Sequence, residues 1–420
     1  MTNILSVEFL QFTVRAALFC CAATAAISPV FGSADTLESK RPNIVLLLAD
    51  DLGFADLGSY GSEINTPSID RLAASGMRFS NFHVAASCAP TRAMLMTGLD
   101  SHTAGVANIP EAIPEDQAHA PAYQGVLKTD IPTVAEMLQS VGYRTLMSGK
   151  WHLGFSDGEK PSERGFDRTL MLADTGADNW RQRSYLPIYA EANWFEDGEP
   201  TTLPENFYSS EYLVDKAIEY IGNRSQQPFF AYVAFQAVHI PVQAPAAFRD
   251  KYLQSYTGGW HDLRKARSEG LARTGVLPAV LEGREMPTTP AWQSLSAEQQ
   301  AFEARGMAVY AGMVDAMDFH VGRLIEHIEK IGELDNTVFI FLSDNGAEGS
   351  IVTRHQAPDS KAPVAPFQLW MRLVDYNTDA QTLGERDSYH DIGPAWASAA
   401  VGPLSWYKFL LEKAGSGCPW

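Results

Sequence analysis

The amino-acid sequence predicts a protein of the α/β class. Short apolar segments alternate along its 420 residues with longer segments of helical periodicity. Three of the short segments, 43–49, 229–235 and 337–343, are almost continuously apolar, which is typical of strands covered on both faces. With 45% hydrophobic residues, the chain can build a large core, arranged as one large domain or two smaller ones.

The remaining elements are predicted by periodicity. The segment 144–148 predicts a fourth strand, which follows a helix-like segment at 134–141. The clearest helix is predicted for 296–332, where apolar residues recur at helical spacing before the 337–343 strand. We expect the segments 155–225 and 255–295, which are rich in Gly, Pro, Trp and charge, to form long loops around the entrance of a site.

The pattern of residues 1–34 is typical of a secretory signal sequence. Arg15 precedes an apolar run at 16–26, and the small residues at 32–34 offer a cleavage site. The run is short for a membrane span, so an uncleaved anchor helix is the second interpretation, and we expect no stable membrane insertion. The expected location of the protein is therefore secreted or periplasmic.

Residues 88–92 (CAPTR) combine a cysteine, a proline and an arginine in a pattern suited to a helix start. Pro90 fits the first helical turn, because the N–H that it lacks would have no partner there. Cys88 then lies where free N–H groups and the helix dipole favour an anion. Arg92, one turn further on, adds a guanidinium on the same face. The segment predicts a nucleophile beside an oxyanion site, and the alternative is a buried thiol at an ordinary helix start.

Charge and cysteine usage narrow the class of protein. The formal net charge of −18 argues against a nucleic-acid partner, because phosphate binding requires clustered Lys and Arg. Signal cleavage would leave only Cys88 and Cys418, which excludes a disulfide scaffold. A bridge between these two residues stays open as an alternative, and it would consume the candidate nucleophile.

Polar side chains follow four of the predicted strands at the points where the strands end. In open α/β sheets, ligand-binding groups gather beyond the carboxyl ends of the strands. Taken singly, each residue would be an ordinary turn or core residue, but together they predict a site. In chain order they are Asp50, Asp51, Lys150, His152, His239, Asp344 and Asn345.

Four of these residues offer oxygen ligands, namely Asp50, Asp51, Asp344 and Asn345. Such a set suits a hard cation, Ca²⁺ or Mg²⁺. Without a cation, three neighbouring carboxylates would repel one another and would be costly to desolvate. The sequence therefore predicts a divalent cation at the strand ends.

Residues 88–92 resemble the sulfatase signature Cys-x-Pro-Ser/Thr-Arg. Four further segments occur in sulfatase order and approximate spacing: 43–51 (NIVLLLADD), 149–152 (GKWH), the segment of His239, and 342–346 (LSDNG). From about Arg41 to about Lys408 the chain is similar to a bacterial-type arylsulfatase of the alkaline phosphatase superfamily.

The resemblance implies an organisation for the whole chain. It implies a large mixed sheet sandwiched by helices, within a catalytic domain at 35–408. It also implies that the smaller carboxyl-terminal domain of the family is largely missing, with an atypical tail at 409–420 in its place.

The resemblance also assigns roles to residues. It implies that a formylglycine-generating (sulfatase-maturating) enzyme converts Cys88 to formylglycine. It implies Ca²⁺, in preference to Mg²⁺, bound by that group with Asp50, Asp51, Asp344 and Asn345. The implied sulfate pocket consists of Arg92, Lys150, His152, His239 and Lys408.

In the reaction that the resemblance implies, one hydroxyl of the hydrated aldehyde attacks sulfur. His239 or Lys408 then protonates the leaving oxygen, and His152 takes the proton of the second hydroxyl as sulfate departs. The expected substrate is a small-molecule or carbohydrate sulfate ester. Two alternatives remain: a phosphonate or phosphodiester hydrolase of the same superfamily, and an inactive, truncated sulfatase-like fragment or binding protein that keeps the fold.

Overall fold

The structure is a computed structural model that describes residues 40–281, 283, 286, 289–351 and 364–410. The predicted signal sequence at 1–34, Cys418 and most of the predicted tail at 409–420 lie outside these described residues. The expectations for them stay predictions.

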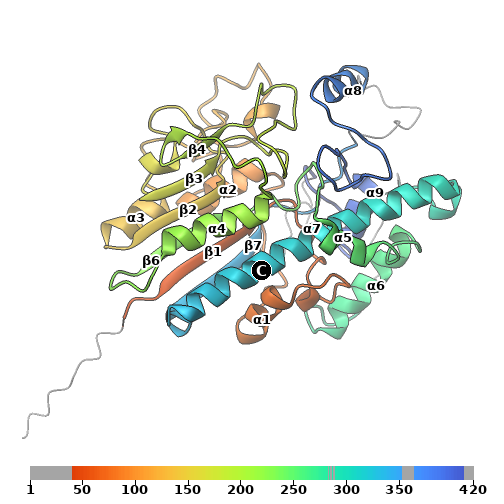
Figure 1. Cartoon of the computed structure of the whole chain (residues 1–420), viewed down its shortest axis with the longest axis horizontal. Helices are drawn as coiled ribbons and strands as arrows, with labels where there is room; N and C mark the ends of the chain where they lie inside the picture. The colour runs from red at the N-terminus through yellow and green to blue at the C-terminus, as the bar shows by residue number, and fades with distance from the viewer. Residues whose placement is uncertain (1–39, 282, 284–285, 287–288, 352–363, 411–420) are drawn as a thin grey trace, which may run out of the picture. The chain divides into compact units, whose positions relative to one another are not determined.

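The described strands form one seven-stranded mixed sheet in the order β5-β4-β3-β2-β6-β1-β7 (Figure 1). Neighbouring strands pair in parallel from β3 to β7, and β4 pairs antiparallel with both β3 and β5. This confirms the α/β prediction and places the carboxyl ends of the four predicted strands along one side of the sheet. The strands are β1 (Asn43–Ala49), β2 (Arg144–Lys150), β3 (Arg168–Leu172), β4 (Trp194–Glu196), β5 (Glu199–Pro200), β6 (Phe229–Ala234) and β7 (Thr337–Ser343).

The central strand β1 shows why the strand segments are so apolar. It pairs with β6 on one side and β7 on the other, so that Leu46 lies between Tyr232 and Ile340. Alternate side chains of β1 enter two different cores, Leu47 on one face and Leu48 on the other. Because both faces are buried, the strand is apolar from Ile44 to Ala49, and its one polar residue, Asn43, is the first.

Helices cover both faces of the sheet. Helices α4 and α7 pack against each other across one face, and α2 and α3 contribute to the core of the other (Figure 1). The helix predicted at 296–332 is confirmed as α7, and the side chain of Ser296 accepts a hydrogen bond from the Gln299 N–H at its start. The α-helices are α1 (Pro67–Ser75), α2 (Cys88–Thr97), α3 (Val134–Ser140), α4 (Ser209–Ile221), α5 (Ala246–Arg249), α6 (Trp260–Arg273), α7 (Ala297–Lys330), α8 (Val364–Leu373) and α9 (Gly393–Ala400).

Short 3₁₀ helices punctuate the loops. They are η1 (Gly58–Tyr60), η2 (Pro110–Ala112), η3 (Pro161–Glu163), η4 (Asp250–Tyr252), η5 (Trp292–Ser294) and η6 (Leu334–Asn336). Within the described part of the chain, no helix combines the length and the apolar character that a membrane crossing requires.

The prediction of long loops at 155–225 and 255–295 is wrong in part. The first segment contains β3, β4, β5 and α4, and the second contains α6. Helix α4 has a readable apolar face that includes Leu213 and Val214. The apolar face of α6, which includes Leu263 and Leu271, is interrupted because Arg264 and Arg267 are buried on it. Arginines on the inner face of a helix weaken its hydrophobic periodicity.

Candidate active site

Cys88 is the first residue of α2, as predicted. The preceding Ser87 has extended backbone angles, and Pro90 lies in the first turn, where its missing N–H costs no hydrogen bond. The Cys88 thiol is free and fully buried. Burial raises its pKa well above the usual range, so the unmodified side chain is a thiol and not a thiolate.

Three carboxylates converge beside this thiol. Asp50 and Asp51 directly follow β1, and Asp344 directly follows the neighbouring β7. The Sγ atom of Cys88 lies 3.5 Å from Oδ1 of Asp50. One ligand atom from each of these four residues lies within 4.8 Å of the others. Neighbouring parallel strands thus deliver their first loop residues to one point, as the sequence predicted.

Asn345 completes the group of oxygen ligands. Its Nδ2 atom donates to Oδ1 of Asp51 over 2.6 Å. Its Oδ1 atom is buried and accepts no hydrogen bond from any described residue. An orphaned acceptor in an acidic cluster is suited to a bound cation.

The donor set and spacing fit a hard divalent ion. Calcium–oxygen distances are about 2.3–2.6 Å, so ligand atoms around one ion lie within about 5 Å of each other. Without an ion, burial raises the pKa of Asp50 to about 6 and that of Asp51 to about 8. Burial is the main cause of both shifts, and a bound cation would favour the ionised carboxylates.

Three buried cations surround the carboxylates. Nζ of Lys150 lies 2.5 Å from Oδ2 of Asp50. Nζ of Lys408 lies 2.9 Å from Oδ1 of Asp51 and 3.1 Å from Oε2 of Glu348. The structure therefore brings Lys408, at the carboxyl-terminal limit of the sulfatase resemblance, to the same cluster.

Arg92 holds its neighbours in place through its guanidinium fork. Nε and Nη2 donate to Oδ2 of Asp344 over 2.9 and 2.7 Å. Nη1 donates to the backbone oxygen of Lys150 over 2.8 Å. The fork therefore ties α2 to the loop after β7 and to the end of β2.

The two predicted histidines lie on loops after β6 and β2. Nδ1 of His239 donates to its neighbour's carbonyl, Ile240 O, over 2.6 Å, which leaves Nε2 3.7 Å from Oδ2 of Asp51. Burial lowers the pKa of His239 well below its usual range. His152 has a left-handed backbone with φ of 58°, and its Nε2 contacts the carboxylate of Glu111. Both histidines thus follow strands whose carboxyl ends carry the other predicted site residues.

Sequence reasoning missed several residues that contact the site. Glu348 follows Asn345 by three residues, so its carboxylate could have been noticed in the same loop. Tyr185 lies edge-on to the His239 ring, with 5.1 Å between ring centroids. Glu111 and Tyr189 come from irregular segments that give no periodic signal. The roles of all these residues stay predictions.

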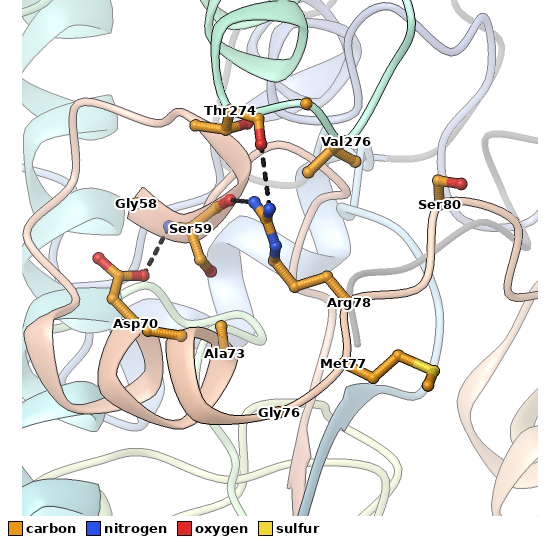
Figure 2. A pocket seen from close by; sticks show the side chains of 12 residues that line it. Gly58, Ser59, Asp70, Ala73, Gly76, Met77, Arg78, Ser80, Thr274 and Val276 are labelled. Atoms are coloured by element: carbon orange, nitrogen blue, oxygen red, sulfur yellow. Dashed lines mark hydrogen bonds between the residues drawn. The ribbon is translucent and has the colours of Figure 1, made fainter.

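A separate pocket of about 730 Å³ lies between α1 and the segment 274–276 (Figure 2). Its Arg78 guanidinium donates to the carbonyl oxygens of Ser59 and Thr274, and Asp70 accepts from the N–H of Ser59. These charged groups hold backbone segments together. None of the predicted site residues lines this pocket.

Comparison with known proteins agrees with the fold and the site. The sulfatase family profile matches residues 42–368, and the chain therefore belongs to the sulfatase family of sulfuric ester hydrolases. It is 39% identical over 399 residues to an uncharacterized sulfatase of Schizosaccharomyces pombe, covering 91% of this chain and 70% of that protein. It is 30% identical over 401 residues to the arylsulfatase of Klebsiella aerogenes, covering 94% of this chain and 83% of that protein.

A solved structure shares the fold. The structure of Ps i-CgsB in complex with k-i-k-neocarrahexaose aligns with a TM-score of 0.58 at 24% identity. The alignment covers 90% of this chain, and the chain spans 65% of the length of that structure. The α/β architecture with one large mixed sheet is thus shared with a solved structure over most of this chain.

Proposed function

We propose that the chain hydrolyses sulfate esters of the arylsulfatase type, with a formylglycine made from Cys88 and a bound Ca²⁺. The convergence of Asp50, Asp51, Asp344 and Cys88 within 4.8 Å carries the proposal. The name of the Klebsiella aerogenes relative, an arylsulfatase, supports the substrate class.

The residues that would hold Ca²⁺ are Asp50, Asp51, Asp344 and Asn345, together with the modified side chain at 88. Carboxylate and amide oxygens suit Ca²⁺, and its flexible coordination tolerates a mixed set better than the strict octahedron of Mg²⁺. When bound, Ca²⁺ would withdraw charge from ester oxygens and the formylglycine would supply an oxygen nucleophile in place of the thiol.

The chain's own cations bind and orient the sulfate group. Lys150 and Lys408 pair with Asp50 and Asp51 in the present structure, and a divalent ion would take over much of that pairing. Their ammonium groups then face a tetrahedral anion, whose developing charge they stabilise. Arg92 orients Asp344 through its two hydrogen bonds.

Lys408 and His239 are the two candidate proton donors to the leaving oxygen. Nε2 of His239 and Nζ of Lys408 lie 3.7 and 2.9 Å from carboxylate oxygens of Asp51. Nδ1 of His239 donates its proton to Ile240 O and burial lowers the pKa of the ring, so Nε2 carries no proton here and Lys408 is the group that holds one.

The mass of residue 88 and the chemistry of turnover test this proposal together. The protein is expressed with and without a formylglycine-generating enzyme, and the mass of the tryptic peptide 79–92 is measured by mass spectrometry. The expected mass corresponds to the replacement of sulfur and two hydrogens by one oxygen. Modified protein should release sulfate from an aryl sulfate, and Cys88→Ala should not, at an unchanged unfolding midpoint. Equal rates for the two proteins would refute the proposal.

The same assay separates the alternatives. Matched aryl sulfate, phosphate diester and phosphonate esters are compared at equal concentration. A higher kcat/KM for the sulfate supports the proposal, whereas a preference for phosphorus esters assigns the chain to the other reaction. Absence of turnover on all three, with residue 88 modified and Ca²⁺ bound, identifies an inactive member of the family.

We also propose that residues 1–34 export the protein to the periplasm or the medium. Their apolar run and small-residue segment support this. Recovery of a chain beginning near residue 35 from the exported fraction is the expected result. Recovery from the cytosol alone, with residues 1–34 intact, would contradict it.

A further inference from the structure

Glu111 contacts His152, and no role described so far explains this contact. It lies in η2 (Pro110–Ala112), far from the strand ends in sequence. Its two carboxylate oxygens lie 3.2 and 3.1 Å from Nε2 of His152. The two side chains are only 8% and 2% exposed, respectively. A buried carboxylate this close to an imidazole fixes the orientation of the ring.

The carboxylate is itself held from a second direction. The hydroxyl of Tyr189, which belongs to the irregular segment after β3, donates to Oε1 of Glu111. Burial alone would raise the pKa of Glu111, but His152 and the hydrogen bond from Tyr189 lower it to about 2. Glu111 is therefore ionised at neutral pH and acts only as an acceptor.

The protonation state of His152 follows from these contacts. Burial lowers the pKa of His152 to about 4, against the opposing effect of Glu111, so the ring is neutral at pH 7. A neutral imidazole has one N–H, and an ionised carboxylate can only accept it, so Nε2 carries the proton. Nδ1 is then an acceptor, and it is buried with no hydrogen-bond partner among the described residues.

The surroundings of the ring belong to the active site. His152 follows Lys150 by two residues at the end of β2, and the charges of Lys150 and Arg92 act on its pKa. His239 follows β6, the strand that pairs with β2, so the two histidine-bearing loops begin at neighbouring strand ends. A buried acceptor nitrogen that has no hydrogen-bond partner in this position is suited to take a proton from a reacting group.

We infer that Glu111 is a positioning residue for the hydrolysis: its carboxylate holds His152 as the Nε2–H tautomer and thereby presents Nδ1 as the proton acceptor. This inference rests on the proposed function. Glu111 touches no reacting atom, and its effect passes through the imidazole. Tyr189 in turn holds the Glu111 carboxylate in place, and so contributes indirectly to the orientation of the His152 ring.

Nitrogen NMR of protein labelled in histidine tests the inference without any turnover. The His152 signal is assigned by its loss in His152→Asn. In the unaltered protein we expect Nδ1 to be unprotonated and Nε2 to be protonated. In Glu111→Gln the amide can accept or donate, so this tautomer should lose its dominance. A His152 that carries its proton on Nδ1 in the unaltered protein overturns the inference, even if Glu111→Gln does not fold.

Kinetics supply the second readout. Glu111→Gln should lower kcat by about 10- to 100-fold and change KM by less than about twofold, because proton transfer is impaired and binding is not. Glu111→Asp, which keeps the charge, should retain part of the rate. A folded Glu111→Gln with unchanged kcat overturns the inference.

An exposed acid–histidine pair provides the matched control. Asp100 and His102 lie 3.4 Å apart, with side chains 68% and 58% exposed. Asp100→Asn makes the same chemical change as Glu111→Gln and should leave kcat unchanged. If the protein proves inactive on every ester, the tautomer measurement still decides the inference, so the two failures are distinguishable.

Discussion

The substitution Arg267→Met tests how the loop after Asp51, one of the proposed metal ligands, is supported. Arg267 of α6 is fully buried and pairs with Asp56, which is also fully buried. A second pair joins Nη2 of Arg267 to Oε1 of Glu63 over 3.0 Å. Asp56 accepts hydrogen bonds from the Gly53 N–H and the Tyr310 hydroxyl, over 2.7 and 2.6 Å. This network lies directly after Asp51 in the chain.

The size of the expected loss in stability is set by the carboxylate that the substitution leaves without a partner. Methionine fills much of the arginine volume, but Asp56 keeps its charge with no cation beside it. Removing one partner of a buried ion pair costs about 3–5 kcal/mol. The double variant Arg267→Met with Asp56→Asn removes the stranded charge and keeps an acceptor for Gly53. It should therefore be more stable than the single variant by about 1 kcal/mol or more.

The loss of stability in Arg267→Met should depend on pH, and the pKa of Asp56 sets the direction. Burial already raises the pKa of Asp56, and loss of Arg267 raises it further. A carboxyl whose folded-state pKa is raised binds a proton more readily in the folded state, so its stabilisation is present at low pH and is lost as the pH rises through that pKa. The deficit of Arg267→Met should therefore be smaller at about pH 5 than at about pH 8. Urea unfolding measures it, and a pH-independent deficit below about 1 kcal/mol would refute the reasoning.

Two further predictions concern a helix start and the metal site. Asp318 of α7 accepts from the N–H groups of Ser68 and Ile69 over 3.0 and 2.7 Å, so Asp318→Ala should cost about 1–2 kcal/mol in urea unfolding. Asp318→Asn, which keeps an acceptor, should cost less, and equal losses would contradict the capping role. Calcium affinity should rise between about pH 5 and pH 8, because Asp50 and Asp51 must lose protons before they bind. Titration calorimetry that shows no pH dependence would argue against carboxylate ligands.

The strands and the cluster at their ends were predictable because one physical constraint shapes both. A strand buried on both faces admits few polar residues, so the polar residue that follows an apolar run marks its end, as Asp50 follows the run Ile44–Ala49 of β1. Parallel pairing then brings that residue beside Asp344 at the end of β7. The sequence pattern and the site geometry follow from the same arrangement.

The other contacts of the site could not be read from the sequence. The acceptor that orients His152 comes from Glu111, in a loop whose path is set by tertiary packing and not by periodicity. Arg267 supports the 50–58 loop through its ion pair with Asp56. Because Arg267 is buried on the inner face of α6, that face does not read as a continuous apolar stripe in the sequence. Long-range polar contacts leave no local signal, because each partner alone looks like a solvated charge.

The burial of Cys88 has a consequence for the order of events during synthesis. Arg92, on the helix that Cys88 begins, pairs with Asp344, which is 252 residues further along the chain. Lys408 pairs with Asp51 across 357 residues. At a ribosomal rate of about 5–20 residues per second, the cysteine emerges roughly 10–50 s before the β7 loop that encloses it. An enzyme that makes the proposed formylglycine from Cys88 would therefore have its best access on the nascent chain, since the finished fold leaves the thiol no exposed surface.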